Sequence, residues 1–448
     1  MSYFQRVPSS GGNRKTFTMS AWIKLAAKSQ ISGAAAMFSA WNADNIAGHF
    51  VWRIKSDGTI GWSRWSDDSY STKKLMDEHA WYHCVIAVDT TQSTAADRVK
   101  VYVNNEQITS WSVGPNYPAQ DTDLPVNHTT SQTIALNNYS SSGSAFKGLI
   151  SHFHLVDGQQ LTPSAFGSTD STTGEWSINA SPTLSYGTNG FFMFKDDNSA
   201  NDDSGQTNNF TLSGTVLKSE DNPSNNFCVL NDFTVRGHPN LERANTQVSN
   251  GCQDGDRVYG TIPSKAGYYE VKLGVDPDGS TGKGFAWGVH NISDYQDHTY
   301  NHTSARMMKT NYGYNTHFAT EDLGGSNSWE GVTTGVDSDA GDILMCAWKN
   351  NKVYFGYNGT WFFSANPSNN TDGSTQVPCD TSAYQVPLGK SHLAGMGDVQ
   401  FNFGSGWFGN SAVSSNSGNG YQDANGQGKF QYQPPTGCYA CCTKNLNL

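Results

Sequence analysis

The sequence has few charged residues and no long apolar run. Only 15% of its 448 residues are Asp, Glu, Lys or Arg, and their formal balance is −11. No stretch approaches the roughly 20 apolar residues of a transmembrane helix, so we expect no membrane insertion. Nucleic-acid and anionic-lipid binding both need a Lys/Arg-rich surface, which this negative balance disfavours. No apolar leader follows Met1, so we expect synthesis in a host cytoplasm without a signal peptide.

Cysteine is also too sparse for a disulfide scaffold. Eight cysteines are spread along the chain, and only Cys438, Cys441 and Cys442 lie close together in the sequence. Small secreted domains held together by disulfides are much denser in cysteine, so buried thiols are the better interpretation. The signatures of a serine hydrolase elbow and of a phosphate-binding glycine loop are missing as well.

The chain is instead rich in uncharged polar residues and aromatic residues. Aromatic residues make up 12% of the chain, including 13 Trp, while Ser, Asn and Gly disfavour long helices. Residues 17–24 and 98–103 alternate between apolar and polar side chains, which is typical of strands with one buried face. Ser56-Asp57-Gly58 separates two further apolar runs and indicates a hairpin. The sequence therefore predicts an all-β protein built from antiparallel sandwiches.

The first third of the chain resembles a known family. Residues 17–24, the strand beginning Trp81-Tyr82-His83, residues 101–105 and residues 148–158 occur in the order found in concanavalin A-like, laminin-G-type jelly rolls. The opening, residues 6–18, is similar to laminin-G-type domains in structural proteins of marine phages. The resemblance covers residues 1–165.

The second half resembles SPRY (B30.2-like) sandwiches. It carries Gly267-Tyr268-Tyr269-Glu270-Val271, then 287–289, 341–344, 354–359 and 402–404, in that family's order. We therefore predict two tandem antiparallel β-sandwich domains of the jelly-roll type, at 1–165 and 227–448. Residues 166–226 are interpreted as a β-rich connector.

These resemblances imply a non-enzymatic phage virion protein. The expected role is a tail fibre, appendage or capsid-surface component that recognises the host by binding carbohydrate on its surface. Other virion subunits are its expected partners, and a homo-oligomer is expected. One alternative is a purely architectural virion protein, and another is a polysaccharide depolymerase. A depolymerase on this scaffold needs carboxylates alternating along one strand, and no such strand is found.

Two sets of candidate site residues follow. A loop stretch rich in Tyr and Asn lies where the SPRY resemblance places variable binding loops, and aromatic rings with amides suit sugars. Its candidate ligand-binding residues are Tyr295, His298, Tyr300, Tyr312, Tyr314 and Asn315. Laminin-G-like sandwiches often hold calcium at a sheet rim, and oxygen ligands suit that hard cation. The candidate calcium ligands are Asp196, Asp197, Asp202 and Asp203, with solvated acidic turns as the alternative interpretation.

Overall fold

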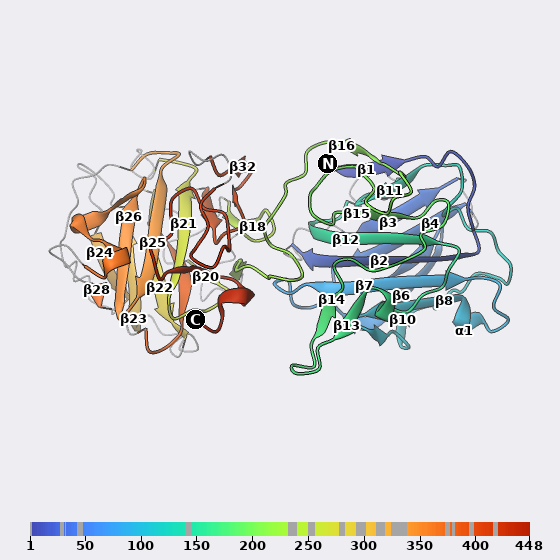
Figure 1. The fold of residues 1–448 in the computed structure, drawn as a ribbon, viewed down its shortest axis with the longest axis horizontal. Helices are drawn as coiled ribbons and strands as arrows, with labels where there is room; N and C mark the ends of the chain where they lie inside the picture. Colours follow the sequence, from blue (N-terminus) through green and yellow to red (C-terminus); the bar gives the residue numbers. More distant parts are fainter. Residues whose placement is uncertain are drawn as a thin grey trace. The chain divides into compact units, whose positions relative to one another are not determined.

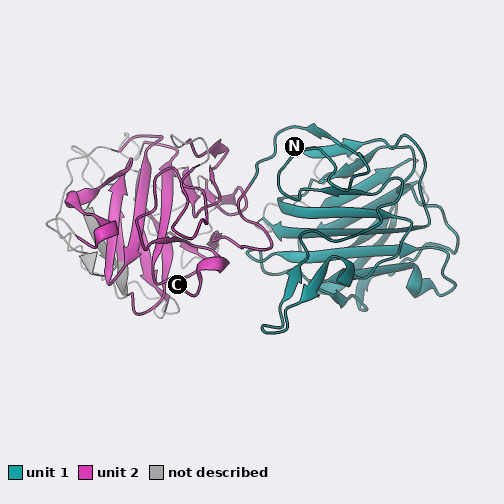
Figure 2. Cartoon of the chain, in the orientation of Figure 1, with its two compact units in different colours: residues 1–218 teal, residues 219–448 magenta. Residues whose placement is uncertain are grey.

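A computed structural model shows two compact units, residues 1–218 and 219–448 (Figure 2). It describes residues 2–26, 31, 33–42, 48–138, 145–231, 240–249, 256–276, 283–292, 302–310, 319–323, 338–371, 377–378, 381–393, 398–414 and 420–448. Across these residues the only α-helix is the four-residue α1 (Ala95–Arg98), and the strands pair almost entirely antiparallel. No helix in this part of the chain has the length and apolar character needed to cross a membrane. The predicted all-β class is confirmed.

Unit 1 is a sandwich of two sheets (Figure 1). Sheet A has the order β10 (Trp111–Val113), β6 (Asp67–Lys74), β5 (Thr59–Arg64), β4 (His49–Lys55), β3 (Ala34–Trp41), β11 (Gln132–Ile134), β1 (Tyr3–Arg6), β16 (Thr211–Ser213). Sheet B has the order β15 (Phe191–Met193), β12 (Gly148–Asp157), β2 (Thr16–Leu25), β7 (Tyr82–Asp89), β8 (Val99–Val103), β9 (Glu106–Gln107). A separate hairpin joins β13 (Gly167–Thr169) to β14 (Trp176–Ile178).

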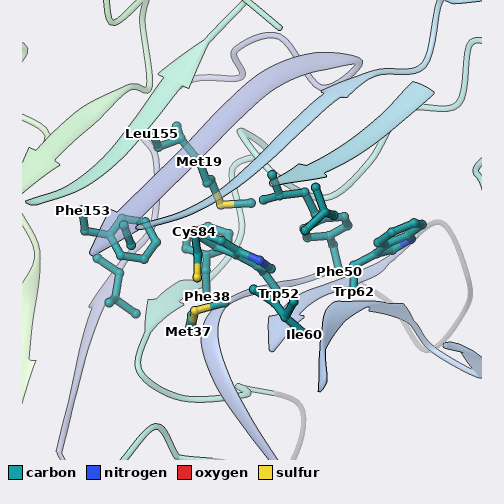
Figure 3. Packing of buried hydrophobic residues seen from close by; sticks show 14 of the residues in the cluster. Met19, Met37, Phe38, Phe50, Trp52, Ile60, Trp62, Cys84, Phe153 and Leu155 are labelled. Atoms are coloured by element: carbon teal, nitrogen blue, oxygen red, sulfur yellow. The ribbon is translucent and has the colours of Figure 1, made fainter. Parts of the chain in front are cut away.

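The core of unit 1 lies between sheets A and B. Met19 from β2, Phe50 and Trp52 from β4, and Phe153 from β12 point toward one another (Figure 3) and are fully buried. The Trp52 and Phe153 rings meet edge to face, with centroids 6.1 Å apart. Burying each such side chain contributes about 1.5–3 kcal/mol, so the period-two pattern of the strands determines which face of each sheet turns inward.

Unit 2 is a second sandwich. Sheet C has the order β17 (Leu230–Asn231), β20 (Arg257–Gly260), β29 (Gln385–Leu393), β22 (Lys283–Asn291), β23 (His302–Lys309), β24 (Ala319–Leu323). Sheet D has the order β18 (Leu241–Glu242), β19 (Gln247–Val248), β30 (Val399–Asn402), β21 (Gly267–Leu273), β25 (Ile343–Lys349), β26 (Lys352–Tyr357), β27 (Thr360–Trp361). In addition, β28 (Val377–Pro378) pairs with β26, and β33 (Tyr439–Ala440) pairs with β21 in parallel. A small hairpin joins β31 (Trp407–Phe408) to β32 (Ser411–Ala412).

The segment predicted as a connector, residues 166–226, divides between the two units. Its part up to Lys218 belongs to unit 1. There, β15 pairs with β12 at one edge of sheet B, and β16 pairs with β1 at one edge of sheet A. The pairing of β15 follows from the apolar run 191–193, which is buried in the sandwich core.

The six described cysteines are buried free thiols. Burial raises the pKa of Cys438 to about 12, and burial raises the pKa of Cys84 above its ordinary value too. A buried protonated thiol packs like a small apolar side chain. For these six residues, the interpretation of the cysteines as buried thiols is confirmed.

Candidate functional site

The predicted ligand-binding stretch cannot be located. Tyr295, His298, Tyr300, Tyr312, Tyr314 and Asn315 all lie outside the described residues. The hypothesis that they bind a ligand therefore stays a prediction.

The predicted calcium ligands lie between β15 and β16, and they differ in their hydrogen bonds and exposure. The Asp202 carboxylate accepts hydrogen bonds from the backbone N–H groups of Phe192, Ser204 and Asn208, at 2.8–2.9 Å. It also accepts one from the Ser204 hydroxyl. Asp202 thus holds a turn against the edge strand β15 by filling its acceptor positions with protein donors.

The other three acids are less engaged. Asp197 accepts from the Ser199 N–H at 2.8 Å, and both Asp196 and Asp197 are exposed. Burial, followed by repulsion from Asp197 and Asp196, raises the pKa of Asp203 above its ordinary value. Throughout the part of the chain that the structure describes, no group of three or more His, Cys, Asp or Glu is arranged to hold a metal ion. Calcium at these residues stays a prediction from the sequence.

A different cluster, the Trp41–His49–Trp65 row, stands at one end of sheet A. Trp41 ends β3, His49 begins β4, and Trp65 occupies the turn after β5. The register pairs Trp41 with His49, and Val51 with Ser63 two residues further along. Because Phe50 and Trp52 point into the core, His49 and its partner Trp41 lie on the outer face of the sheet, and the Trp65 ring contacts His49. Trp41 is 36% exposed and Trp65 is half-buried, whereas His49 is buried between them.

His49 positions the row through both ring nitrogens. Its Nδ1 accepts a hydrogen bond from the backbone N–H of Trp65 at 2.9 Å. A nitrogen that accepts from an N–H carries no proton in the neutral ring, so Nε2 bears the proton and donates to Asn137 Oδ1 at 3.4 Å. The His49 and Trp65 rings meet edge to face, with centroids 6.4 Å apart. One buried imidazole therefore fixes the Trp65 turn and orients an amide beside it.

The Trp65 turn is strained. Arg64 pairs with Asp67, so only Trp65 and Ser66 make the connection, and Trp65 has φ of 55°. Turns of this length normally place Gly, Asn or Asp at a positive φ, because a bulky side chain there is unfavourable. Such strain persists where the surroundings enforce it, and it is concentrated at functional sites. The sequence did carry a signal for this site: a Trp stands between two strand patterns, where a turn residue is expected. Our sequence analysis missed it.

The charged groups near the row are paired with one another. The nearby carboxylates of Asp67 and Asp68 form ion pairs with Arg64 at 3.3 Å and with Arg53 at 2.6 Å. Each acid is therefore engaged by its own guanidinium and is not poised opposite a second carboxylate. Flat aromatic rings at the surface, with nearby charges paired, match the chemistry of a carbohydrate.

Comparison with known proteins supports the fold of the first sandwich. Residues 3–166 match the family model Laminin_G_3, described as the concanavalin A-like lectin/glucanases superfamily. The expected laminin-G-like, concanavalin A-like resemblance is therefore confirmed for that part of the chain. No curated protein sequence matches.

Solved structures of several kinds are similar to parts of the chain. A putative carbohydrate binding protein from Bacteroides ovatus aligns at 16% identity and a TM-score of 0.31, covering 48% of this chain and 56% of that one. A heptameric SAP-like pentraxin from Limulus polyphemus aligns at 15% identity and 0.26, covering 36% and 71%. A human SPRY domain aligns at 15% identity and 0.25, covering 38% and 94%.

Proposed function

We propose that this protein is a non-enzymatic surface component of a phage virion, and that unit 1 binds host-surface glycan at the Trp41–His49–Trp65 row. The observation that carries the binding proposal is the placement of the two indoles around one buried imidazole. His49 holds Trp65 in a backbone conformation that a Trp does not adopt without support. The virion assignment rests on the sequence resemblance to structural proteins of marine phages.

Carbohydrate is the ligand class that this surface favours. A sugar ring presents an apolar face to an indole and hydroxyl groups to neighbouring amides. The exposed indole of Trp41 supplies the first kind of contact, and the half-buried Trp65 lies on the next strand connection beyond His49. Because the nearby arginines are paired with acids, the row offers little net charge to attract an ionic ligand.

The test is binding of the purified, fluorescently labelled full chain to candidate host bacteria, with soluble surface polysaccharide as competitor. The wild type is expected to bind saturably and to be displaced by the polysaccharide. Trp41→Ala and Trp65→Ala are each expected to weaken binding at least about tenfold, since burying an indole contributes about 1.5 kcal/mol or more.

Tyr384→Ala is the matched control, because Tyr384 is a comparably exposed aromatic residue (38%) in unit 2. It is expected to bind like the wild type. Absence of binding, with the protein still retained in purified particles, would favour the architectural alternative. Release of reducing ends from the polysaccharide would favour the depolymerase alternative. Binding that survives both Trp substitutions would place the site elsewhere.

A further inference from the structure

A segment of unit 1, residues 158–189, crosses the outer face of sheet B, and we call it the strap. It contains β13, β14 and a short 3-10 turn at Pro163–Ala165. Phe166 and Tyr186 of the strap are buried with Val85, Tyr102 and other residues on the side of the sheet facing away from the core. The β13–β14 hairpin lies next to β7 (Figure 1). The strap is thus a layer added outside the sandwich.

The hairpin is attached to β7 through a histidine that must be neutral. The indole Nε1–H of Trp176 donates to Nδ1 of His83 at 2.9 Å. An indole nitrogen can only donate, so His83 Nδ1 must present a lone pair. The imidazole proton therefore lies on Nε2, which is 2.8 Å from the hydroxyl of Ser20 on β2. Adding a proton to Nδ1 would place two N–H groups against each other.

The ring of His83 is also enclosed. It is stacked on Trp22 of β2, with centroids 4.9 Å apart, and it lies nearly coplanar with Trp176 of the strap, whose centroid is 5.8 Å away across the hydrogen bond. Stacking on the Trp22 face favours an imidazolium. However, the Trp176 N–H leaves the added proton without an acceptor, and burial lowers the pKa of His83 to about 3.

Two more buried histidines on β12 lie under the same strap. His154 Nδ1 is 2.8 Å from the Tyr186 hydroxyl, and its ring is stacked 4.0 Å from that of Phe192. His152 is hydrogen-bonded to Ser151 and faces the strap backbone at Ala180. Burial holds the pKa of His154 well below its ordinary value and lowers the pKa of His152 to about 4.

Few charged groups face these rings. Asp196 and Lys195 act on His152 with opposite signs, and Asp202 and Asp203 act on Tyr186. His154 is additionally disfavoured as a cation by His152 and His83, and no carboxylate acts on His83. Protonation of His83 or His154 therefore meets burial or another histidine without a counter-charge, whereas Asp196 and a backbone hydrogen bond at Ala180 offset part of the burial at His152.

We propose that the strap is an acid-operated latch: protonation of His83, His152 and His154 releases residues 158–189 from sheet B while the sandwich stays folded. Each histidine has a lower pKa under the docked strap than the 6.5 of a solvated ring. Docking is therefore fully favoured above pH 6.5 and weakens as the pH falls. At pH 5, protonation of His83, whose pKa is about 3 under the docked strap, shifts the balance toward release about 30-fold, and His152 and His154 shift it in the same direction.

Hydrogen exchange read by mass spectrometry on the full chain, between pH 7.5 and pH 5.0, tests the latch. After correction for the intrinsic pH dependence of exchange, peptides covering residues 166–186 are expected to lose protection in acid. Peptides from β2 and β7 are expected to remain protected. Unchanged strap protection at pH 5.0 would overturn the proposal. Simultaneous loss in β2 and β7 would overturn it too, because that outcome is unfolding of the whole unit.

Three variants separate the latch from a general loss of stability. His83→Gln removes one titrating group, so the acid-induced change in strap protection is expected to shrink about 30-fold. Trp176→Phe keeps an aromatic ring but removes the donor, so the strap is expected to exchange faster at pH 7.5. His79→Gln, at a histidine paired with Asp77, is expected to leave the response unchanged. An equal acid response in His83→Gln and in the wild type would also overturn the mechanism.

Discussion

Glu270 of β21 provides a sharp test of how unit 2 is held together. Its side chain lies on the outer face of sheet D and is completely buried. One carboxylate oxygen accepts from the Tyr268 hydroxyl at 2.9 Å and the Tyr432 N–H at 2.8 Å. The other accepts from the Asn402 amide at 3.1 Å and the Gln431 N–H at 2.9 Å. The carboxyl group therefore ties the segment near residue 431 to the sheet.

Burial outweighs these four donors and raises the pKa of Glu270 from 4.5 to about 7. The neutral form also fits the site, because its proton can be donated to the Tyr268 oxygen, the only one of the four partners able to accept. A folded-state pKa above the unfolded one contributes stability that is complete below pH 4.5 and is lost as the pH rises through 7. The loss amounts to about 3 kcal/mol, at 1.36 kcal/mol per pH unit.

The measurement is urea unfolding of the full chain at pH 5 and pH 8, followed through hydrogen exchange in β21 and β30. The wild type is expected to be less stable in unit 2 at pH 8. Glu270→Gln is expected to remove most of this difference. It should also cost about 1–3 kcal/mol at pH 5, because an amide N–H then faces a backbone N–H. A slope that survives Glu270→Gln, or wild-type stability that rises with pH, would refute this reasoning.

Two further predictions concern unit 1 and use thermal unfolding with matched controls. Gly61→Ala should destabilise the unit by about 3 kcal/mol, because a Cβ there would lie 1.7 Å from the Ser69 carbonyl oxygen. Its control is Gly11→Ala, which should be neutral because no atom lies within 4 Å of the added Cβ. An equal loss of stability in both variants would contradict the packing argument. Asp202→Ala should cost about 3 kcal/mol by stranding backbone donors, whereas Asp196→Ala at an exposed position should change little. The cost at Asp202 should be the same with calcium or EDTA, and an effect confined to calcium would instead favour the predicted ion.

Much of the fold could be predicted from local sequence pattern. The alternation at residues 17–24 corresponds to β2, and residues 267–273 correspond to β21. The turn at 349–351 joins β25 to β26, whose ladder closes at Lys349 and Lys352. These features are local, because side-chain period and turn residues act over a few positions. They fix the strands without fixing which strands become neighbours.

The candidate site depends on which strands become neighbours, and local sequence pattern does not specify this. His49 and Trp65 are brought together by the register of β4 and β5, and Asn137 reaches them from a loop after β11. Likewise, His83 and Trp176 are 93 positions apart in the sequence. Such long-range pairs have no periodic signature, so residue type alone directed attention to the Tyr- and Asn-rich stretch and the acidic loop.

In each unit a segment near its beginning pairs with a segment near its end, and this pairing determines how the unit responds to mechanical tension. In unit 1, β1 pairs antiparallel with β16, with Tyr3 opposite Ser213. In unit 2, Phe227 pairs antiparallel with Cys442. In both cases the chain enters and leaves at the same end of the pair, so tension pulls the two paired segments apart from that end; in unit 2 the pair is an isolated bridge. Their hydrogen bonds are then loaded one after another rather than together. Each sandwich is therefore expected to open at low force from its closing strands, extending the chain while the remaining strands of that sandwich stay paired.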